Sequence, residues 1–356
     1  MSSEMIVQSR SGPYSVKFED SRQFDVARFP AENSHLLIDS NVANLYADQL
    51  EKILSRPTTI LIEATEENKS LESITPVLHK LVANSIRRDH SIIAIGGGIV
   101  QDICCFAAST LLRGVPWKFI PTTLLAQADS CIGSKSSINL GSAKNILGTF
   151  NPPSEIFIYS SFLNSLNQRE IYSGIGEMLK VHAIDGYASF NKISNDYDKL
   201  VADRVVLSEY IRASLEIKKR FIEVDEFDRG VRNIFNYGHS FGHAIESATK
   251  YLVPHGIGVS IGMDMANFVS AERGLTPRKN YLRMNVTLRK NYLPFAKTKI
   301  PFDSVIAALR KDKKNTNTML GLILPVGNDA KIERVMVPLD GDFKESCSKF
   351  LVGLPG

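Results

Sequence analysis

The chain has 356 residues, more than the ~100–200 of a typical domain, so we expect two domains. Hydrophobic residues make up 44% and charged residues 22% of the chain, which is ordinary for a globular protein. The net charge of +4 is spread along the chain and is not gathered in a basic stripe, which argues against nucleic-acid binding and fits a small anionic substrate.

The sequence indicates a cytoplasmic protein that does not enter membranes. The N-terminal stretch MSSEMIVQSRSGPYSVKF has no apolar core of signal-peptide length, and no segment approaches the roughly 18–20 apolar residues of a membrane span. The four cysteines form no CxxC pair or disulfide framework, which is typical of a reducing compartment.

The first half of the chain alternates short apolar runs with helical patterns. Strands are predicted at residues 35–39, 58–64, 91–98, 117–123 and 155–161, with a helix at 71–86 among the connections. This alternation predicts a Rossmann-like parallel sheet with crossover helices in an α/β domain over residues 1–172.

From about Ser173 the apolar residues take helical spacing over long segments, including residues 198–224. A late pair of apolar runs, 318–327 and 331–338, is typical of a small hairpin. We therefore expect a mostly α-helical second domain over residues 173–356.

A glycine triplet, Gly96 to Gly98, follows the predicted strand SIIAI directly. Glycines let backbone amides approach a pyrophosphate at a helix N-terminus, but this is not the GxGxxG fingerprint, and a plain tight turn is the alternative. Other polar side chains also fall where strands end, at the edge where open α/β sheets bind ligands. They are Asp39, Asn41, Glu66, Lys69, Thr122 and Thr123.

Three histidines are candidates for a metal site. His239 and His243 are four residues apart, on one face of a helix, and His255 follows in PHG. Either both members of the first pair bind a metal, or one binds it and the other contacts the substrate. Together with Glu177, three residues before Lys180 in GEMLK, two histidines would form a catalytic, zinc-like set with an open position. Buried structural histidines are the alternative.

Several cations stand among apolar or small residues. A solvated surface lysine is the ordinary interpretation of each, but a site for a phosphorylated acid needs several fixed cations. They are Lys135, Lys144, Lys180, Lys218, Arg232 and Lys314.

These motifs together resemble the dehydroquinate synthases, a family of sugar phosphate cyclases. The resemblance is carried by GGGIVQDICCF, PTTLLAQADSCIGSKSSIN, AKNILG, GEMLK and IKKRFIEVDEFDRGVRNIFNYGHSFGHAIE, in that order. It implies an NAD- and divalent-metal-dependent phosphate lyase, with zinc or cobalt as the metal, and a homodimer.

The resemblance also implies roles for individual residues. The metal ligands would be Glu177, His239 and His255. NAD would contact Asp39, Asn41, Glu66, Lys69, Gly97, Gly98, Asp102, Thr122, Thr123 and Lys144. Substrate would contact Asp129, Lys135, Asn145, Lys180, Lys218, Arg232, Asn236, His243 and Lys314, and Arg113 would reach the neighbouring subunit's site.

Two motifs depart from the family. Dehydroquinate synthases usually read GGKTGIN where this chain has GSKSSIN, and HGEAV where it has HGIGV. Among the changed positions, Ser136, Ser137 and Ile257 change the lining beside the implied ligands and bear on the substrate more than on the chemistry.

The reaction that the resemblance implies is redox-neutral. A ring alcohol is oxidised with NAD, phosphate is eliminated, the hydride is returned, and the opened ring closes by an intramolecular aldol reaction. His243 and the phosphate itself are both candidate bases.

Three functions remain open at this point. A phosphorylated heptulosonate, the substrate of the shikimate pathway to aromatic amino acids, is favoured because Lys218 and Arg232 suit a carboxylate. A specialised cyclase acting on a neutral sugar phosphate, such as sedoheptulose 7-phosphate, is the alternative. A metal-dependent polyol dehydrogenase ranks third, because that group lacks the lysine-rich phosphate set.

Overall fold

The computed structural model describes residues 4–19, 28–141, 143–295, 298–311 and 319–354. Its contacts divide the chain into two compact units. The first comprises Met1–Leu166 and Lys218–Phe227, and the second comprises Asn167–Ile217 and Asp228–Gly356. The short segment Lys218–Phe227 thus packs with the first unit although it lies far along the chain.

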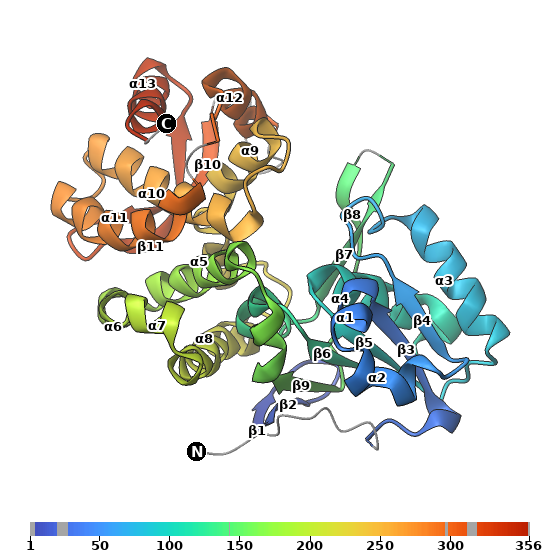
Figure 1. Ribbon diagram of the computed structural model, residues 1–356. Coiled ribbons are helices and arrows are strands. Elements are labelled where there is room, and N and C mark those ends of the chain that lie inside the picture. The colour runs from blue at the N-terminus through green and yellow to red at the C-terminus, as the bar shows by residue number, and fades with distance from the viewer. Residues whose placement is uncertain (1–3, 20–27, 142, 296–297, 312–318, 355–356) are drawn as a thin grey trace. The chain divides into compact units, whose positions relative to one another are not determined.

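The first unit is built on a seven-stranded sheet in the order β1-β2-β9-β6-β5-β3-β4 (Figure 1). Only β1 and β2 pair antiparallel, and every other neighbouring pair in this sheet is parallel. The strands are β1 Glu4–Val7, β2 Tyr14–Glu19, β3 Ser34–Asp39, β4 Thr59–Ile62, β5 Ser91–Gly96, β6 Trp117–Pro121 and β9 Glu155–Tyr159. The parallel sheet predicted from the sequence is therefore confirmed.

Helices connect these strands. They are η2 Ala31–Asn33, α1 Ser40–Leu45, α2 Ala47–Leu54, α3 Leu71–Ala83, α4 Gly98–Thr110, η3 Leu111–Arg113, η4 Ala126–Ser130 and η5 Ser160–Ser165. Such crossover connections put helices on the faces of a parallel sheet, which is why its strands read as near-continuous apolar runs.

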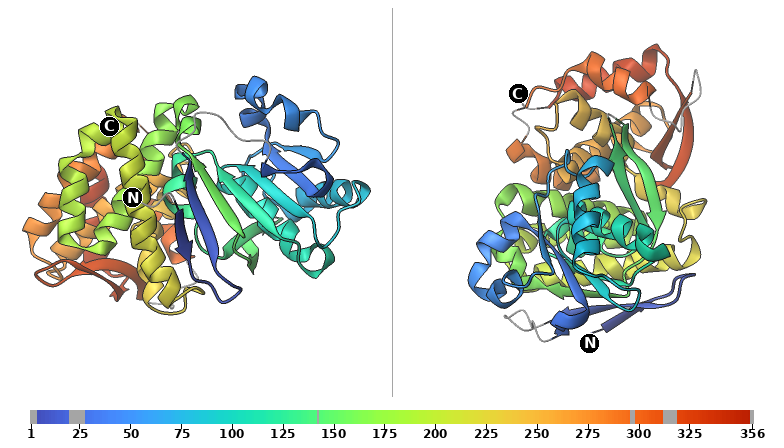
Figure 2. Two further views of the ribbon diagram at one scale, coloured as in Figure 1. Left: turned by 90° about the horizontal axis from the view of Figure 1, so that it is seen from below. Right: turned by 90° about the vertical axis from the view of Figure 1, so that its right-hand side faces the viewer.

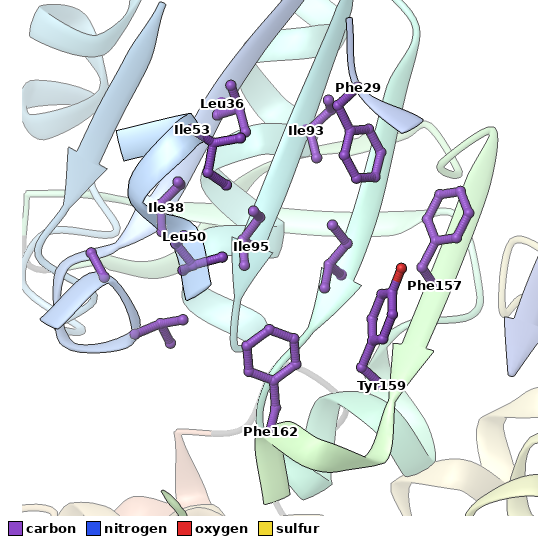
Figure 3. Packing of buried hydrophobic residues seen from close by; sticks show 13 residues of the cluster. Phe29, Leu36, Ile38, Leu50, Ile53, Ile93, Ile95, Phe157, Tyr159 and Phe162 are labelled. Atoms are coloured by element: carbon purple, nitrogen blue, oxygen red, sulfur yellow. The ribbon is translucent and has the colours of Figure 1, made fainter. Parts of the chain in front are cut away.

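One face of the sheet forms a hydrophobic cluster with the first two helices. Leu36 and Ile38 alternate along β3, and Ile93 and Ile95 do so along β5, so the four point to one side. They pack with Leu50, Ile53 and other apolar residues of α1 and α2. Phe157 and Tyr159 of β9 and Phe162 of η5 belong to the same cluster (Figure 3).

Two strand pairs were not predicted from the sequence. Strands β1 and β2 extend the sheet beside β9, as Figure 2 shows for the dark-blue strands next to the green one. Strands β7 Lys135–Leu140 and β8 Ala143–Phe150 form a separate antiparallel hairpin that projects from the first unit (Figure 1). Most of β8 is exposed, so its sequence lacks the alternation that marks a half-buried strand.

The second unit is mostly helical, as expected. Its helices are α5 Gln168–Asp185, α6 Tyr187–Asn195, α7 Tyr197–Ala202, α8 Arg204–Val224, η6 Val231–Asn236, α9 His239–Ala248, α10 His255–Glu272, α11 Arg278–Tyr292, η7 Leu293–Phe295, α12 Phe302–Arg310 and α13 Gly341–Val352. The last residues of α8 belong to the first unit. The predicted late hairpin is confirmed as β10 Met319–Val326 and β11 Lys331–Pro338.

Helix α10 lies at the centre of the second unit. It packs against α9, α11 and α5, and nearly all of its residues are buried. A helix that is apolar on all sides belongs in an interior. None of the helices in the described ranges is both long and apolar enough to cross a membrane. All four cysteines of the chain lie in these ranges, and they are buried and free.

Candidate active site

Helix α5 holds the first two site residues. Its start is fixed by a capping box, in which the Asn167 side chain accepts from the Glu170 backbone N–H and the Glu170 side chain accepts from the Asn167 backbone N–H. Glu177 and Lys180 then lie one turn apart, both buried, and Lys180 Nζ is 2.5 Å from Glu177 Oε2. A buried carboxylate is retained only when cations face it, and Lys180 is one such cation.

Two histidines approach the same carboxylate from other helices. His239 begins α9 and His255 begins α10. Their Nε2 atoms lie 3.6 Å and 3.2 Å from Glu177 Oε1. The carboxylate is only 1% exposed, and neither of its oxygens has a well-aligned hydrogen bond among the described residues.

Close contact between helix backbones makes this convergence possible. A Cβ added to Gly176 would lie 2.1 Å from the Gly256 carbonyl oxygen, so no larger residue fits where α5 meets α10. Gly176 precedes Glu177 and Gly256 follows His255 directly. The two helix backbones are therefore in close contact directly beside the two side chains that meet.

The charges on these groups follow from burial and from one another. Burial would raise the pKa of Glu177, but the Lys180 ammonium holds it well below its usual range. Burial keeps the pKa of His239 well below its usual value, so this ring is neutral. Burial also acts to lower the pKa of His255, but the nearby Glu177 and Glu246 carboxylates raise it to about 10.

This arrangement fits a divalent cation. A buried anionic carboxylate and a neutral imidazole supply one oxygen and one nitrogen donor, and His255 can release its proton to supply another. His243 stands beside them: one ring nitrogen from each of His239, His243 and His255 lies within 4.8 Å of the others. His243 is exposed, and its ring stacks on His255 with centroids 5.5 Å apart. The two roles considered for His243, ligand or substrate contact, are both compatible with this position.

In the first unit, several of the expected cofactor residues form one polar network. Lys69 Nζ donates to Asp102 Oδ2 at 3.1 Å and to Asn145 Oδ1 at 2.7 Å. Lys144 Nζ lies 3.7 Å from Glu66 Oε1. Residues from three separate parts of the first unit are thus brought together.

Asn139 completes this network, and we did not predict it. Its side-chain amide donates to Glu66 Oε1 at 3.0 Å, and its side-chain oxygen accepts from the Asn145 backbone at 2.9 Å. Asn139 thereby links the loop after β4 to the β7–β8 hairpin. In the sequence, only the position of Asn139 at the end of the motif GSKSSIN indicated that it could belong to the site.

Asp102 lies in the first turns of α4, after the glycine triplet. Burial raises its pKa to about 6, although Lys69 acts in the opposite direction. Gly97 is the N-cap of this 13-residue helix, so free backbone N–H groups stand at its start. Thr122 and Thr123 follow β6, and the Thr122 backbone donates to the Gly96 carbonyl oxygen at 2.9 Å.

Lys218 and Asp129 form a buried pair within the first unit. Lys218 Nζ lies 2.6 Å from both the carbonyl oxygen and Oδ1 of Asp129. Both residues are less than 9% exposed. Lys218, which the resemblance places facing the substrate's carboxylate, therefore already has an anionic partner in Asp129.

The remaining predicted residues are spread over both units. Asp39 caps α1 by accepting from the Asn41 backbone at 2.8 Å. Lys135 and Arg113 are exposed, on β7 and η3. In the second unit Arg232 is 7% exposed, and Asn236 donates to the Asn233 carbonyl oxygen. Lys314 lies outside the described residues.

Glu246 is the second residue that the sequence analysis missed. It lies on α9, and its Oε1 accepts from His255 Nδ1 at 3.0 Å. Its spacing of seven residues from His239 puts it on the histidine face of the helix, which was the only local signal.

Comparison with known proteins identifies relatives along most of the chain. A family model described as 3-dehydroquinate synthase N-terminal matches residues 59–173, and one described as 3-dehydroquinate synthase C-terminal matches residues 174–315. A 3-dehydroquinate synthase of Thermoanaerobacter sp. (strain X514) is 34% identical over 313 residues, which is 86% of this chain and 88% of the relative.

Two solved structures share the fold. A 2-deoxy-scyllo-inosose synthase complexed with carbaglucose-6-phosphate, NAD+ and Co2+ has a TM-score of 0.82 at 24% identity, covering 97% of this chain and 99% of its own. The 2-epi-5-epi-valiolone synthase of Streptomyces hygroscopicus subsp. jinggangensis 5008, with NAD+ and Zn2+ bound, has a TM-score of 0.80 at 27% identity, covering 95% and 96%.

Proposed function

Because the chain belongs to the 3-dehydroquinate synthase family, we propose that it converts a phosphorylated heptulosonate into a carbocycle with release of phosphate. The cluster of Glu177, His239 and His255 is the observation that carries this proposal, because a buried carboxylate and two imidazoles converge on one point, as the ligands of one metal ion do. A cyclase for a neutral sugar phosphate is the second candidate, favoured by the two sugar phosphate cyclases that share the fold.

The proposed cofactors are NAD and one divalent metal ion, zinc or cobalt. Glu177, His239 and His255 would hold the metal. The network around Lys69 and Asp102, together with the start of α4, would hold NAD, since helix N-termini favour phosphate groups. When bound, NAD supplies reversible oxidation of a ring alcohol, and the metal acts as a Lewis acid on that oxygen.

Protein side chains would orient the substrate and stabilise the charge that develops on the leaving phosphate. Lys180, beside Glu177, and His243, beside His255, are the proposed contacts to substrate oxygens in the second unit. Lys135 and Asn145 of the β7–β8 hairpin are proposed as further substrate contacts. Fixed donors of this kind lower the barrier because they need no rearrangement during the reaction.

Arg232 supports an acidic substrate. Lys218 is paired with Asp129, so the two charges together are close to neutral and fit a polyol as well as an acid. Arg232 is buried, which disfavours its interpretation as a solvated surface cation. A buried guanidinium matches a carboxylate with two parallel hydrogen bonds.

A homodimer is also proposed. Arg113 is exposed next to Leu112, and both adopt left-handed backbone angles, with φ of 67° and 52°. Non-glycine residues in this region are strained, and strain of this kind clusters at functional sites. The turn would hold Arg113 out toward the site of a second subunit.

Phosphate release by the purified protein tests this function. The protein, supplied with NAD and zinc or cobalt, should release phosphate from the heptulosonate at a higher kcat/KM than from sedoheptulose 7-phosphate. The reverse preference would select the neutral-sugar cyclase, and release from neither substrate would contradict both candidates.

A further inference from the structure

The two proposed histidine ligands are held by different partners at their second ring nitrogen. His239 Nδ1 faces the carbonyl oxygen of Tyr237 at 3.2 Å, which is a neutral acceptor. His255 Nδ1 faces Oε1 of Glu246 at 3.0 Å, which is a carboxylate. A carboxylate that accepts the N–H of an imidazole makes the opposite nitrogen a stronger ligand.

The His255 ring is therefore fixed at both edges. On one side Nδ1 meets Glu246, and on the other Nε2 lies 3.2 Å from Glu177. Only Nε2 faces the carboxylate that would share the metal. When the His255 ring is neutral, the contact to Glu246 keeps its one proton on Nδ1. Nε2 then carries the electron pair that can bind a metal.

We propose that Glu246 is a positioning residue that orients His255 for metal binding through Nδ1. This rests on the metal site of the proposed function. It adds a residue from α9 whose side chain would not touch the metal.

Zinc affinity of the metal-stripped protein tests this, measured by competition with a chelator and without any substrate. Glu246→Ala should weaken zinc binding by about 10–100-fold. Glu246→Gln should weaken it less, because the amide oxygen still accepts the Nδ1 proton. Glu272→Gln is the matched control: Glu272 lies on the same helix as His255 but pairs with Arg278, so zinc affinity should not change.

Two results would overturn the proposal. One is wild-type zinc affinity, within about twofold, in Glu246→Ala. The other is an equal loss of affinity in Glu246→Ala and Glu246→Gln. If Glu246→Ala does not fold, Glu246→Gln decides the question: reduced zinc affinity supports the proposal and wild-type affinity overturns it. Because affinity is read without substrate, a failure of the proposed cyclase activity leaves this test intact.

Discussion

Lys218 and Asp129 are 89 residues apart in the sequence, yet Lys218 Nζ donates to the Asp129 carbonyl oxygen at 2.6 Å and pairs with its carboxylate at the same distance. This contact attaches the end of α8 to the segment after β6 within the first unit. It also changes the argument about substrate charge. Since Lys218 already has an anionic partner, a carboxylate on the substrate is best tested at Arg232.

Replacing Arg232 with alanine should reduce kcat/KM on the heptulosonate by roughly thirtyfold to several-thousandfold. Removing one partner of a buried charge pair costs about 2–5 kcal/mol, and ~1.4 kcal/mol is a factor of ten. Arg229→Ala is the control, because Arg229 is exposed three residues earlier. A loss below about fivefold would contradict the carboxylate role and favour a neutral sugar phosphate.

Replacing His255 with alanine should remove the metal and turnover together. The variant loses one of three donors, and a site with one carboxylate and one imidazole holds a divalent ion weakly. Metal content after dialysis, measured by elemental analysis, checks this. His79→Ala, at an exposed position on α3, should retain the metal. If His255→Ala also keeps its full metal content, His255 is not a ligand.

Turnover should require NAD without accumulating NADH. The proposed reaction oxidises and then reduces the same substrate molecule, so the net redox change is zero. Absorbance at the NADH band, followed together with phosphate release, should stay flat while phosphate accumulates. Growth of NADH in proportion to product would instead assign the protein to the polyol dehydrogenases.

Stability should depend on pH through Asp264, a carboxyl buried in α10. Burial raises its pKa to about 6, although its oxygen Oδ2 accepts from Tyr292 and Asn285 at 2.7 Å each. A raised pKa means that the contribution of Asp264 to folding is complete below about pH 4 and is lost as the pH rises past about 6.

The Asp264→Asn variant removes this dependence. Its unfolding free energy relative to wild type should rise by about 2 kcal/mol between pH 4.5 and pH 7.5, because wild type loses ~1.36 kcal/mol per pH unit from pH 4.5 up to the Asp264 pKa of about 6. Urea unfolding at the two pH values measures it. Asp303→Asn, at an exposed position on α12, is the control. An unchanged difference between Asp264→Asn and wild type at the two pH values would contradict the prediction.

The sequence alone determined much of this protein. Five apolar runs separated by helical patterns predicted the five central strands of the sheet. A strand that is buried on both faces is apolar along its whole length, so it can be recognised from its own residues. The spacing of His239 and His243 placed them on one helix face, and the glycine triplet marked the turn before α4. These features depend on residues close together in the chain, so local periodicity was enough to find them.

Only the tertiary structure decided which distant residues meet. The contact of Gly176 with Gly256 brings Glu177 to His255, and the pairing of Lys218 with Asp129 neutralises a charge that looked available. Glu246 was missed because a glutamate on a helix face is usually solvated. Its role depends on a histidine that begins another helix, and this relationship leaves no pattern in the sequence because it arises from packing between helices.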